Sequence, residues 1–163
     1  MSISMYRASI PVFIRALGNL SAILKKGEAH ENSASFIDAR FAPDMLTLAG
    51  QVQRASDAVK AGAARLGGID SPSFPDTEKT FAELQARIKK TIDFLQSVSP
   101  EQIDGGEQRT IQLKAGQREL KFTGMDYLLG FVLPNLYFHV TTAYDILRHK
   151  GVPIGKMDYL GSY

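Results

Sequence analysis

Apolar side chains recur at intervals of three and four residues along most of this chain, and this spacing limits its fold more than any other feature. Residues 4–26 show the pattern clearly. Their apolar positions are Ile10, Phe13, Ile14, Leu17, Leu20 and Leu24. Side chains at such intervals share one face of an α-helix, because the helix turns about 100° per residue. The sequence therefore predicts an amphipathic helix over residues 4–26.

Three more segments carry the same helical period. A second helix is predicted from Pro43 or Asp44 to residue 66, a third over residues 76–97, and a last one over residues 125–150, broken at Pro134. For the third helix, Thr80 and Glu83 fit a capping box, with Asp76 and Thr77 as the other candidate caps. Four amphipathic helices in one chain of 163 residues favour an all-α fold, an antiparallel four-helix bundle forming a single domain over residues 1–163.

The apolar period changes from helical to alternating just before the last helix. Residues 110–114 and 119–123 alternate polar and apolar side chains, and Ala115-Gly116-Gln117 separate the two runs. Alternation places one set of side chains on each face of a strand, and a short glycine-containing segment closes a hairpin. We predict a β-hairpin at about residues 109–123, with its apolar side against the helices or a second subunit, since an isolated hairpin is only marginally stable.

Composition excludes several classes of site. The chain has no cysteine, which excludes disulfides, a thiol nucleophile and cysteine-ligated zinc or iron–sulfur centres. A net charge of +2 without a concentrated basic run argues against nucleic-acid binding. Arg7 and Arg15 interrupt the apolar N-terminal segment, so neither a signal peptide nor a membrane span is expected. A cytoplasmic location follows as the default expectation.

His139 is the candidate site residue that these patterns single out. It lies at the edge of the apolar arc of the last helix, and Asp44 and Gln51 could face it from the second helix. A metal pair on a helix takes ligands at positions i and i+4, but the fourth residue after His139 is Ala143. Three interpretations stay open: a buried histidine hydrogen-bonded to Gln51 or Asp44, a ligand-binding site, or a metal site with His139 as one ligand.

Two blocks of sequence resemble a known family. One is Arg40-Phe41-Ala42-Pro43-Asp44-Met45 leading into Gln51-Val52-Gln53; the other comprises residues 138–149 and 151–161. Together they resemble an uncharacterised bacterial domain-of-unknown-function family related to the DinB/YfiT-like superfamily. That resemblance implies an antiparallel four-helix bundle, often dimeric. It also implies a divalent metal held by three histidines, one from the second helix and an HxxxH pair from the last, and in some members a thiol cofactor.

Only His139 matches that histidine set, because Ala143 replaces its partner and the second helix has no histidine. We therefore expect a DinB-like bundle without the usual metal site, which binds a small ligand or a partner through Asp44, Gln51 and His139. One alternative is a metal- or thiol-dependent transferase or isomerase, with nickel, zinc or iron on unconventional ligands around His139. The other is a structural homodimer held by the hairpin and the face of Tyr137 and Phe138.

Overall fold

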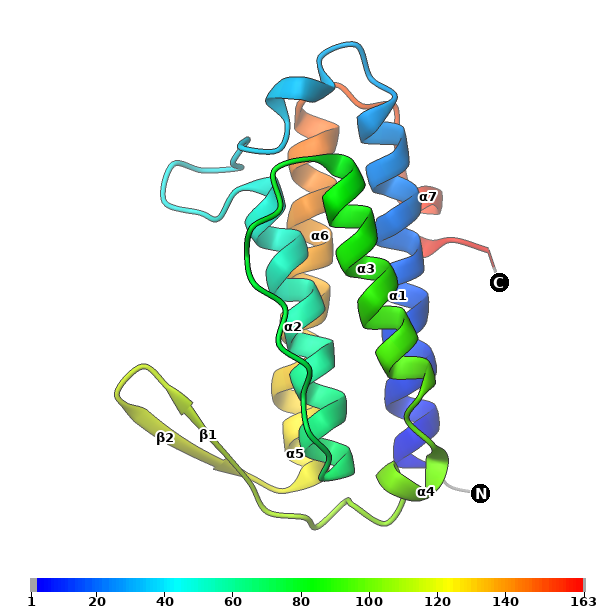
Figure 1. The fold of residues 1–163 in the computed structure, drawn as a ribbon, viewed down its shortest axis with the longest axis vertical. Helices are drawn as coiled ribbons and strands as arrows, with labels where there is room; N and C mark the ends of the chain where they lie inside the picture. The colour runs from blue at the N-terminus through cyan, green and yellow to red at the C-terminus, as the bar shows by residue number, and fades with distance from the viewer. Residues whose placement is uncertain (1–2, 163) are drawn as a thin grey trace.

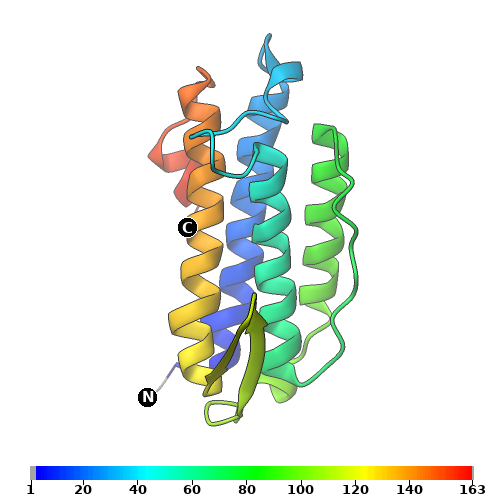
Figure 2. The same cartoon turned by 90° about the vertical axis from the view of Figure 1, so that its left-hand side faces the viewer.

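Four long helices lie side by side and form the body of the molecule in the computed structural model, which describes residues 3–162 (Figures 1 and 2). Their bounds are α1 (Met5–Glu28), α2 (Leu48–Gly67), α3 (Phe81–Gln96) and α6 (Leu133–His149). Helix α2 packs against α6 and α3, and α1 packs against the same two helices from the other side. The predicted helical bundle with a hairpin before the last helix is confirmed.

Short elements connect the four helices. They are the 3-10 turn η1 (Ser33–Ser35), α4 (Pro100–Ile103), strands β1 (Ile111–Ala115) and β2 (Arg118–Phe122), α5 (Gly124–Tyr127), the π-helical segment η2 (Leu128–Val132) and α7 (Lys156–Leu160). The strands pair antiparallel, with Ile111 opposite Phe122. The base of the hairpin packs on the bundle, where the Phe122 ring lies 5.8 Å from the rings of Tyr127 and Phe131. The tip projects away from the helices (Figure 1).

The segment between α2 and α3, residues 69–80, runs back along α2, and we call it the crossover strap. Near its middle, the Phe74 ring centroid lies 4.3 Å from Nζ of Lys60. Near its end, Oε2 of Glu78 accepts a hydrogen bond from Nε2 of Gln53 at 2.9 Å. The strap thus returns the chain to the starting end of α2, so α2 and α3 run parallel while α1 and α6 run the other way (Figure 1). Bundles with such crossover connections are a known variant of the four-helix architecture.

Helix α2 begins later than the sequence predicted. The expected start was Pro43 or Asp44, but the helix begins at Leu48, with Thr47 as its cap. Oγ1 of Thr47 accepts a hydrogen bond from the Gly50 amide at 3.1 Å. Residues 41–46 instead form a loop that contains a turn, and Pro43 and Asp44 belong to that loop. Proline and aspartate are as common in turns as they are at helix starts.

Helix α3 begins at Phe81, after Thr80, so the Thr80 cap is the correct one of the candidates. The Glu83 amide donates to Oγ1 of Thr80 at 3.2 Å, and the Glu83 carboxylate accepts from the Lys79 amide at 2.7 Å. These two bonds satisfy amides that a helix start otherwise leaves unpaired. The predicted start at residue 76 was wrong because Asp76 belongs to the crossover strap.

The last helical region is continuous through Pro134, where the sequence predicted a break. Helix α5 passes directly into η2 and then into α6, with Pro134 in the first turn of α6. In η2 the amide of Leu133 bonds to the carbonyl of Leu128, which is the wider π spacing. Proline is tolerated at the first turn of an α-helix because its missing amide would have had no α-helical partner there.

Helix α1 is long and apolar enough to cross a membrane by length and composition alone, although no membrane span was expected from the sequence. The most apolar 18-residue stretch of this 24-residue helix has a mean hydropathy of 1.2. In the bundle, its apolar stripe is buried in the core against α3 and α6. Core helices of water-soluble bundles commonly meet the same criterion.

Candidate functional site

His139 on α6 lies opposite Gln51 on α2, as its place on the apolar arc indicated. The distance between Nδ1 of His139 and Oε1 of Gln51 is 2.8 Å, a normal hydrogen bond. Gln51 is 1% exposed, whereas His139 is half-buried at the edge of the α2–α6 contact. The pair therefore joins a fixed amide inside the bundle to an imidazole at its surface.

The amide of Gln51 determines which ring nitrogen of His139 carries the proton. Nε2 of Gln51 donates to the Leu46 carbonyl at 3.4 Å, so Oε1 is the atom that faces the imidazole. An amide oxygen only accepts hydrogen bonds, and Nδ1 must therefore donate. In the neutral ring, this leaves the lone pair on Nε2.

Nε2 of His139 has no hydrogen-bond partner among residues 3–162, yet it is not a buried orphan. Within that range, Nε of Arg87 is the one fully buried side-chain nitrogen or oxygen without a partner. Nε2 of His139 accordingly keeps contact with solvent. The site thus presents an oriented, accessible acceptor atom whose opposite nitrogen is already satisfied.

The surroundings keep this imidazole neutral. Burial lowers the pKa of His139 below its ordinary value of 6.5, and the positive charge of Arg54 lowers it further. A neutral ring is the form that accepts a proton, accepts a hydrogen bond or binds a metal. The arrangement can therefore act as a base or as a hydrogen-bond acceptor at neutral pH.

The structure does not bring Asp44 to this pair. Asp44 is exposed in the loop before α2, and within residues 3–162 it makes no hydrogen bond or ion pair. The prediction that it faces inward depended on an α2 beginning at residue 44, which the later start at Leu48 removes. Of the three predicted ligand-binding residues, only Gln51 and His139 are in contact.

The residues around His139 do not fit a three-histidine metal site. Ala143, one turn further along α6, is fully buried and offers a methyl group. Gln51 stands on the facing helix, and its oxygen is engaged with Nδ1 of His139. Across the described part of the chain, no three His, Asp, Glu or Cys side chains lie close enough together to hold a metal ion. One imidazole nitrogen, that of His139, is therefore available as a metal ligand, whereas the superfamily pattern has three histidine ligands.

Two residues with exposed apolar side chains adjoin the pair. Phe138 is 55% exposed, and its ring lies edge-on to His139 at 5.2 Å. Leu46, whose carbonyl holds Gln51, is 44% exposed. Large apolar groups left in water beside an oriented polar atom are typical of a contact surface for a ligand or a partner.

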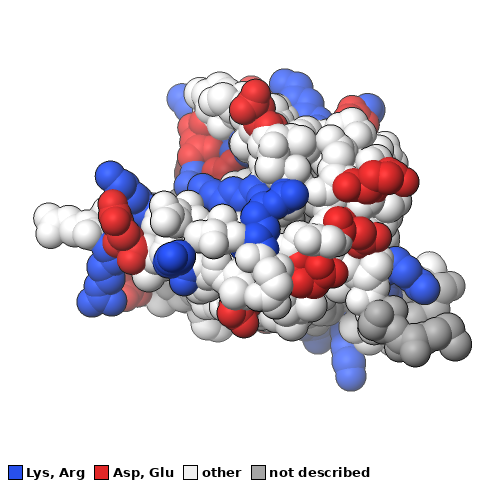
Figure 3. Space-filling view, turned by 90° about the horizontal axis from the view of Figure 1, so that it is seen from below, with Lys and Arg blue, Asp and Glu red and all other residues white. Residues whose placement is uncertain are grey.

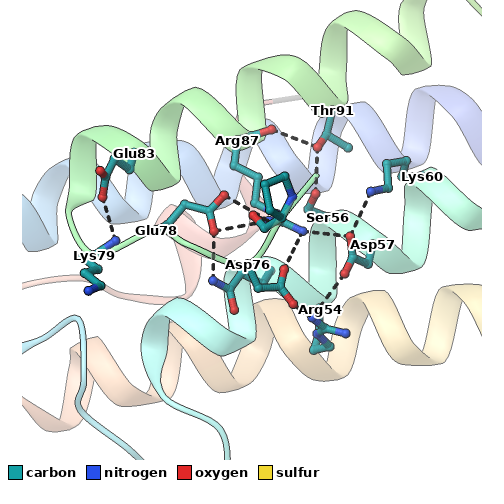
Figure 4. A network of polar contacts seen from close by, with 12 residues as sticks. Arg54, Ser56, Asp57, Lys60, Asp76, Glu78, Lys79, Glu83, Arg87 and Thr91 are labelled. Atoms are coloured by element: carbon teal, nitrogen blue, oxygen red, sulfur yellow. Dashed lines mark hydrogen bonds and ion pairs between the residues drawn. The ribbon is translucent and has the colours of Figure 1, made fainter. Parts of the chain in front are cut away.

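A second polar cluster lies between α2, α3 and the crossover strap, and the sequence patterns did not single it out (Figure 4). Its centre is Arg87, whose side chain is 1% exposed. The guanidinium contacts Asp57 at 2.9 Å, Asp76 at 3.0 Å and Glu78 at 3.0 Å. Burial alone would lower the pKa of Arg87, but the hydrogen bond to Glu78 and the three carboxylates outweigh it and raise the pKa.

Further charges balance this cluster. Lys60 contacts Asp57 at 3.1 Å, and Arg54 pairs with both Asp57 and Asp76. Three cationic and three anionic side chains then face one another. The arrangement matches a structural clamp that fastens the strap to both helices. A signal for it was present in the sequence, because Arg87 falls between Leu84 and Thr91 on the buried side of α3.

Charges of both signs are interspersed on the end of the bundle seen in Figure 3. Both basic and acidic side chains are spread across this view. The described residues on this end therefore form no concentrated basic face of the kind that phosphate backbones require.

Comparison with known proteins places the chain among relatives of the same size. Residues 5–160 match the family described as "Domain of unknown function (DUF1993)". The crystal structure of a DinB family member protein from Shewanella denitrificans is 38% identical and superposes with a TM-score of 0.87. That match covers 97% of this chain and 92% of the other. No curated protein matches the chain.

Proposed function

The chain belongs to the DUF1993 family of DinB-like proteins, and on that premise we propose that it binds a small ligand or partner group at His139. The contact atom in this proposal is Nε2, which accepts a hydrogen bond from an N–H or O–H group. One observation carries it: the Gln51 amide fixes Nδ1 as the donor and leaves an accessible lone pair on Nε2.

The neighbouring side chains support an amphiphilic ligand. Phe138 and Leu46 are exposed apolar groups next to the pair, so an aromatic or aliphatic body would remove them from water. Burying apolar surface contributes about 25 cal/mol per Å². The hydrogen bond to Nε2 would then supply orientation rather than most of the affinity.

Phenol and anisole form a suitable pair of probes, because they share a ring and only phenol can donate a hydrogen bond. In a titration followed by ¹⁵N–¹H NMR, phenol should shift the resonances around Gln51 and His139 at lower concentration than anisole. His139→Ala should remove this preference, whereas His149→Ala, an exposed histidine on the same helix, should keep it. Equal responses to both probes, or no change in His139→Ala, would refute the proposal.

Metal-dependent chemistry is the competing interpretation, and metal analysis separates the two. Protein purified without an affinity tag should contain less than stoichiometric nickel, zinc or iron. A stoichiometric ion that disappears in His139→Ala would replace the ligand-binding proposal with the transferase or isomerase alternative. His149→Ala is the control for metal bound adventitiously at an exposed histidine.

A homodimer is the second candidate, favoured by the exposed aromatic face of α6. Tyr137 and Phe138 are neighbours on α6 and are 43% and 55% exposed, and exposed apolar side chains that lie together can mark a protein–protein contact. A mass measurement in solution tests it directly. A dimer that dissociates in Phe138→Ser, or when the hairpin tip is shortened, would support a structural role. A monomer at micromolar concentration would leave ligand binding at His139 as the proposal.

A further inference from the structure

Strand β2 forms one edge of the hairpin, and this edge has no partner. The sheet consists of β1 and β2, and within residues 3–162 no further strand pairs with it. Both strands extend away from the four long helices (Figure 1). A two-stranded hairpin is only marginally stable in water, and a free edge presents unpaired backbone groups to any complementary strand.

The register of the hairpin decides which backbone groups of β2 point to this free edge. Ala115 and Arg118 flank a two-residue turn, in which Gly116 has a φ of +61°. Residues that flank such a turn exchange hydrogen bonds with each other, and bonded and non-bonded pairs then alternate along the strands. The backbone groups of every second residue from Arg118 onward therefore point to β1, whereas those of Glu119 and Lys121 point outward.

A second copy of β2 can pair antiparallel with this edge in three registers, because residues whose backbone groups point outward must lie opposite one another. Two of these registers place Glu119 opposite Glu119 or Lys121 opposite Lys121, and like charges directly opposite each other are destabilising. The third register places Glu119 of each copy opposite Lys121 of the other. Its two-fold axis passes through Leu120, which lies opposite its own equivalent. Charge thus selects one register.

Both faces of the resulting four-stranded sheet suit this register. On the polar face, Nζ of Lys114 lies 3.9 Å from Oε1 of Glu119, so the new pair with Lys121 continues a row of alternating charges across the axis. On the other face, Leu113 packs against the hydrophobic core and lies opposite Leu120, which is partly exposed. Pairing would place Leu120 against its own equivalent and cover its open side.

The edge of β1 offers no comparable match. By the same alternation, the residues of β1 whose backbone groups point outward are Gln112 and Lys114. Pairing β1 with a second copy of itself would set Lys114 opposite Lys114 or opposite an uncharged amide, and in no register would opposite charges face each other. The self-complementary edge of the hairpin is therefore that of β2.

We propose that two copies of the chain associate through β2, with a two-fold axis at Leu120, and form one four-stranded antiparallel sheet. In strand addition of this kind, the backbone supplies hydrogen bonds and the side chains set the specificity. A strand of five residues gives a smaller interface than a stable dimer needs, so the association is weak and requires high protein concentration. This surface is distinct from the His139 site and from Phe138, so this proposal and the proposed function can fail independently.

A single cysteine at the axis is the direct test. The chain has no cysteine of its own. Leu120→Cys would place two thiols in a non-hydrogen-bonded pair with Cα atoms about 4.5 Å apart, which is within the range of a disulfide. Oxidised glutathione should therefore convert this variant to a covalent dimer. In Leu113→Cys the two Cα atoms would be three strand spacings apart, about 14 Å, and the protein should stay monomeric. Equal cross-linking of the two variants would overturn the proposal, as would a Leu120→Cys protein that stays monomeric.

Charge exchange in the Leu120→Cys background tests the register. Lys121→Glu would oppose acidic side chains across the axis and should slow cross-linking about 3- to 10-fold. Glu119→Lys, carried together with Lys114→Glu to keep the charge pair inside the hairpin, would oppose basic side chains and should slow it similarly. A mixture of the two proteins again pairs opposite charges and should restore the rate. An unchanged rate in Lys121→Glu, or no recovery in the mixture, would refute the proposal.

Two further variants exclude indirect effects. Lys90→Glu makes the same change of charge at an exposed position of α3, and Phe138→Ser removes an exposed aromatic ring from α6. Neither should alter the cross-linking rate of Leu120→Cys. Loss of cross-linking in Phe138→Ser would assign the contact between copies to α6 and overturn the hairpin interface.

Discussion

Nδ1 of His139 and Oε1 of Gln51 lie 2.8 Å apart, joining residues separated by 88 positions in the chain. The bond ties α6 to the first turns of α2 and fixes the orientation of the imidazole. Everything proposed for the site depends on this relationship, because it decides which ring nitrogen faces outward.

Replacing the Gln51 amide by a carboxylate should reverse the direction of the pKa shift at His139. In the parent chain, burial and the Arg54 charge lower this pKa below 6.5. In Gln51→Glu, a negative charge beside Nδ1 should raise it above 6.5, because an opposite charge favours the protonated ring. Histidine ring NMR titration measures the change. Gln96→Glu adds the same charge at the exposed end of α3 and should leave the pKa of His139 where it is.

The lowered pKa of His139 also predicts how stability depends on pH. The unfolded chain takes up a proton near pH 6.5, while the folded chain takes it up only at lower pH. The contribution of His139 to the free energy of unfolding should therefore be greatest above pH 6.5. It should fall as the pH drops below that value. Urea titrations from about pH 7.5 to pH 5 measure the slope. His139→Gln should flatten it; an unchanged slope in that variant would assign the effect to another group.

Removing Arg87 should strongly destabilise the bundle. Arg87→Leu leaves Asp57, Asp76 and Glu78 without their shared buried cation, and breaking a buried ion pair from one side costs about 3–5 kcal/mol. Lys89→Ala is the matched control, because Lys89 makes an exposed pair with Asp93 on the same helix. Such pairs contribute about 1 kcal/mol or less. Comparable losses of unfolding free energy in the two variants would contradict the clamp.

Two glycine substitutions should change stability in opposite directions. A Cβ at Gly62 on α2 would lie 2.7 Å from Cγ1 of Val132, so Gly62→Ala should cost about 1–3 kcal/mol through overpacking. At Gly18 on α1, a Cβ would meet nothing within 4 Å among the described residues. Gly18→Ala should therefore stabilise the helix by about 0.5–1 kcal/mol. Thermal unfolding of the two variants tests the sign, and Val132→Ala should rescue Gly62→Ala.

The sequence patterns were sufficient for the helices, because each helix buries one periodic face, and for the hairpin, because its residues alternate between polar and apolar. They were insufficient where one residue type suits two structures. Pro43 and Asp44 favour a helix start and a turn equally well, so the Thr47 cap was missed. Pro134 normally interrupts a helix, but the π segment before it places proline in a first turn. The spacing of apolar residues reveals neither the π-helical turn of η2 nor the parallel arrangement of α2 and α3.

Helical geometry allowed only those site residues that lie on the long helices to be predicted. His139 and Gln51 each lie beside the apolar arc of a long helix, and packing those arcs together brings them into contact. Asp44 was misplaced because it lies outside α2. The partners of Arg87 include Asp76 and Glu78 from the crossover strap, and no periodicity predicts the path of an extended segment.

The crossover strap has a consequence for the integrity of the chain. Residues 69–80 lie on the surface in extended form, yet the Arg87 clamp fastens their second half to both α2 and α3. A peptide bond cut near Gly68 would divide the protein into a fragment containing α1 and α2 and another containing α3 and α6. Each fragment would carry half of a single core, so neither could bury its apolar stripes alone. The two pieces should remain associated as a noncovalent complex, and they should reassemble when expressed separately and mixed.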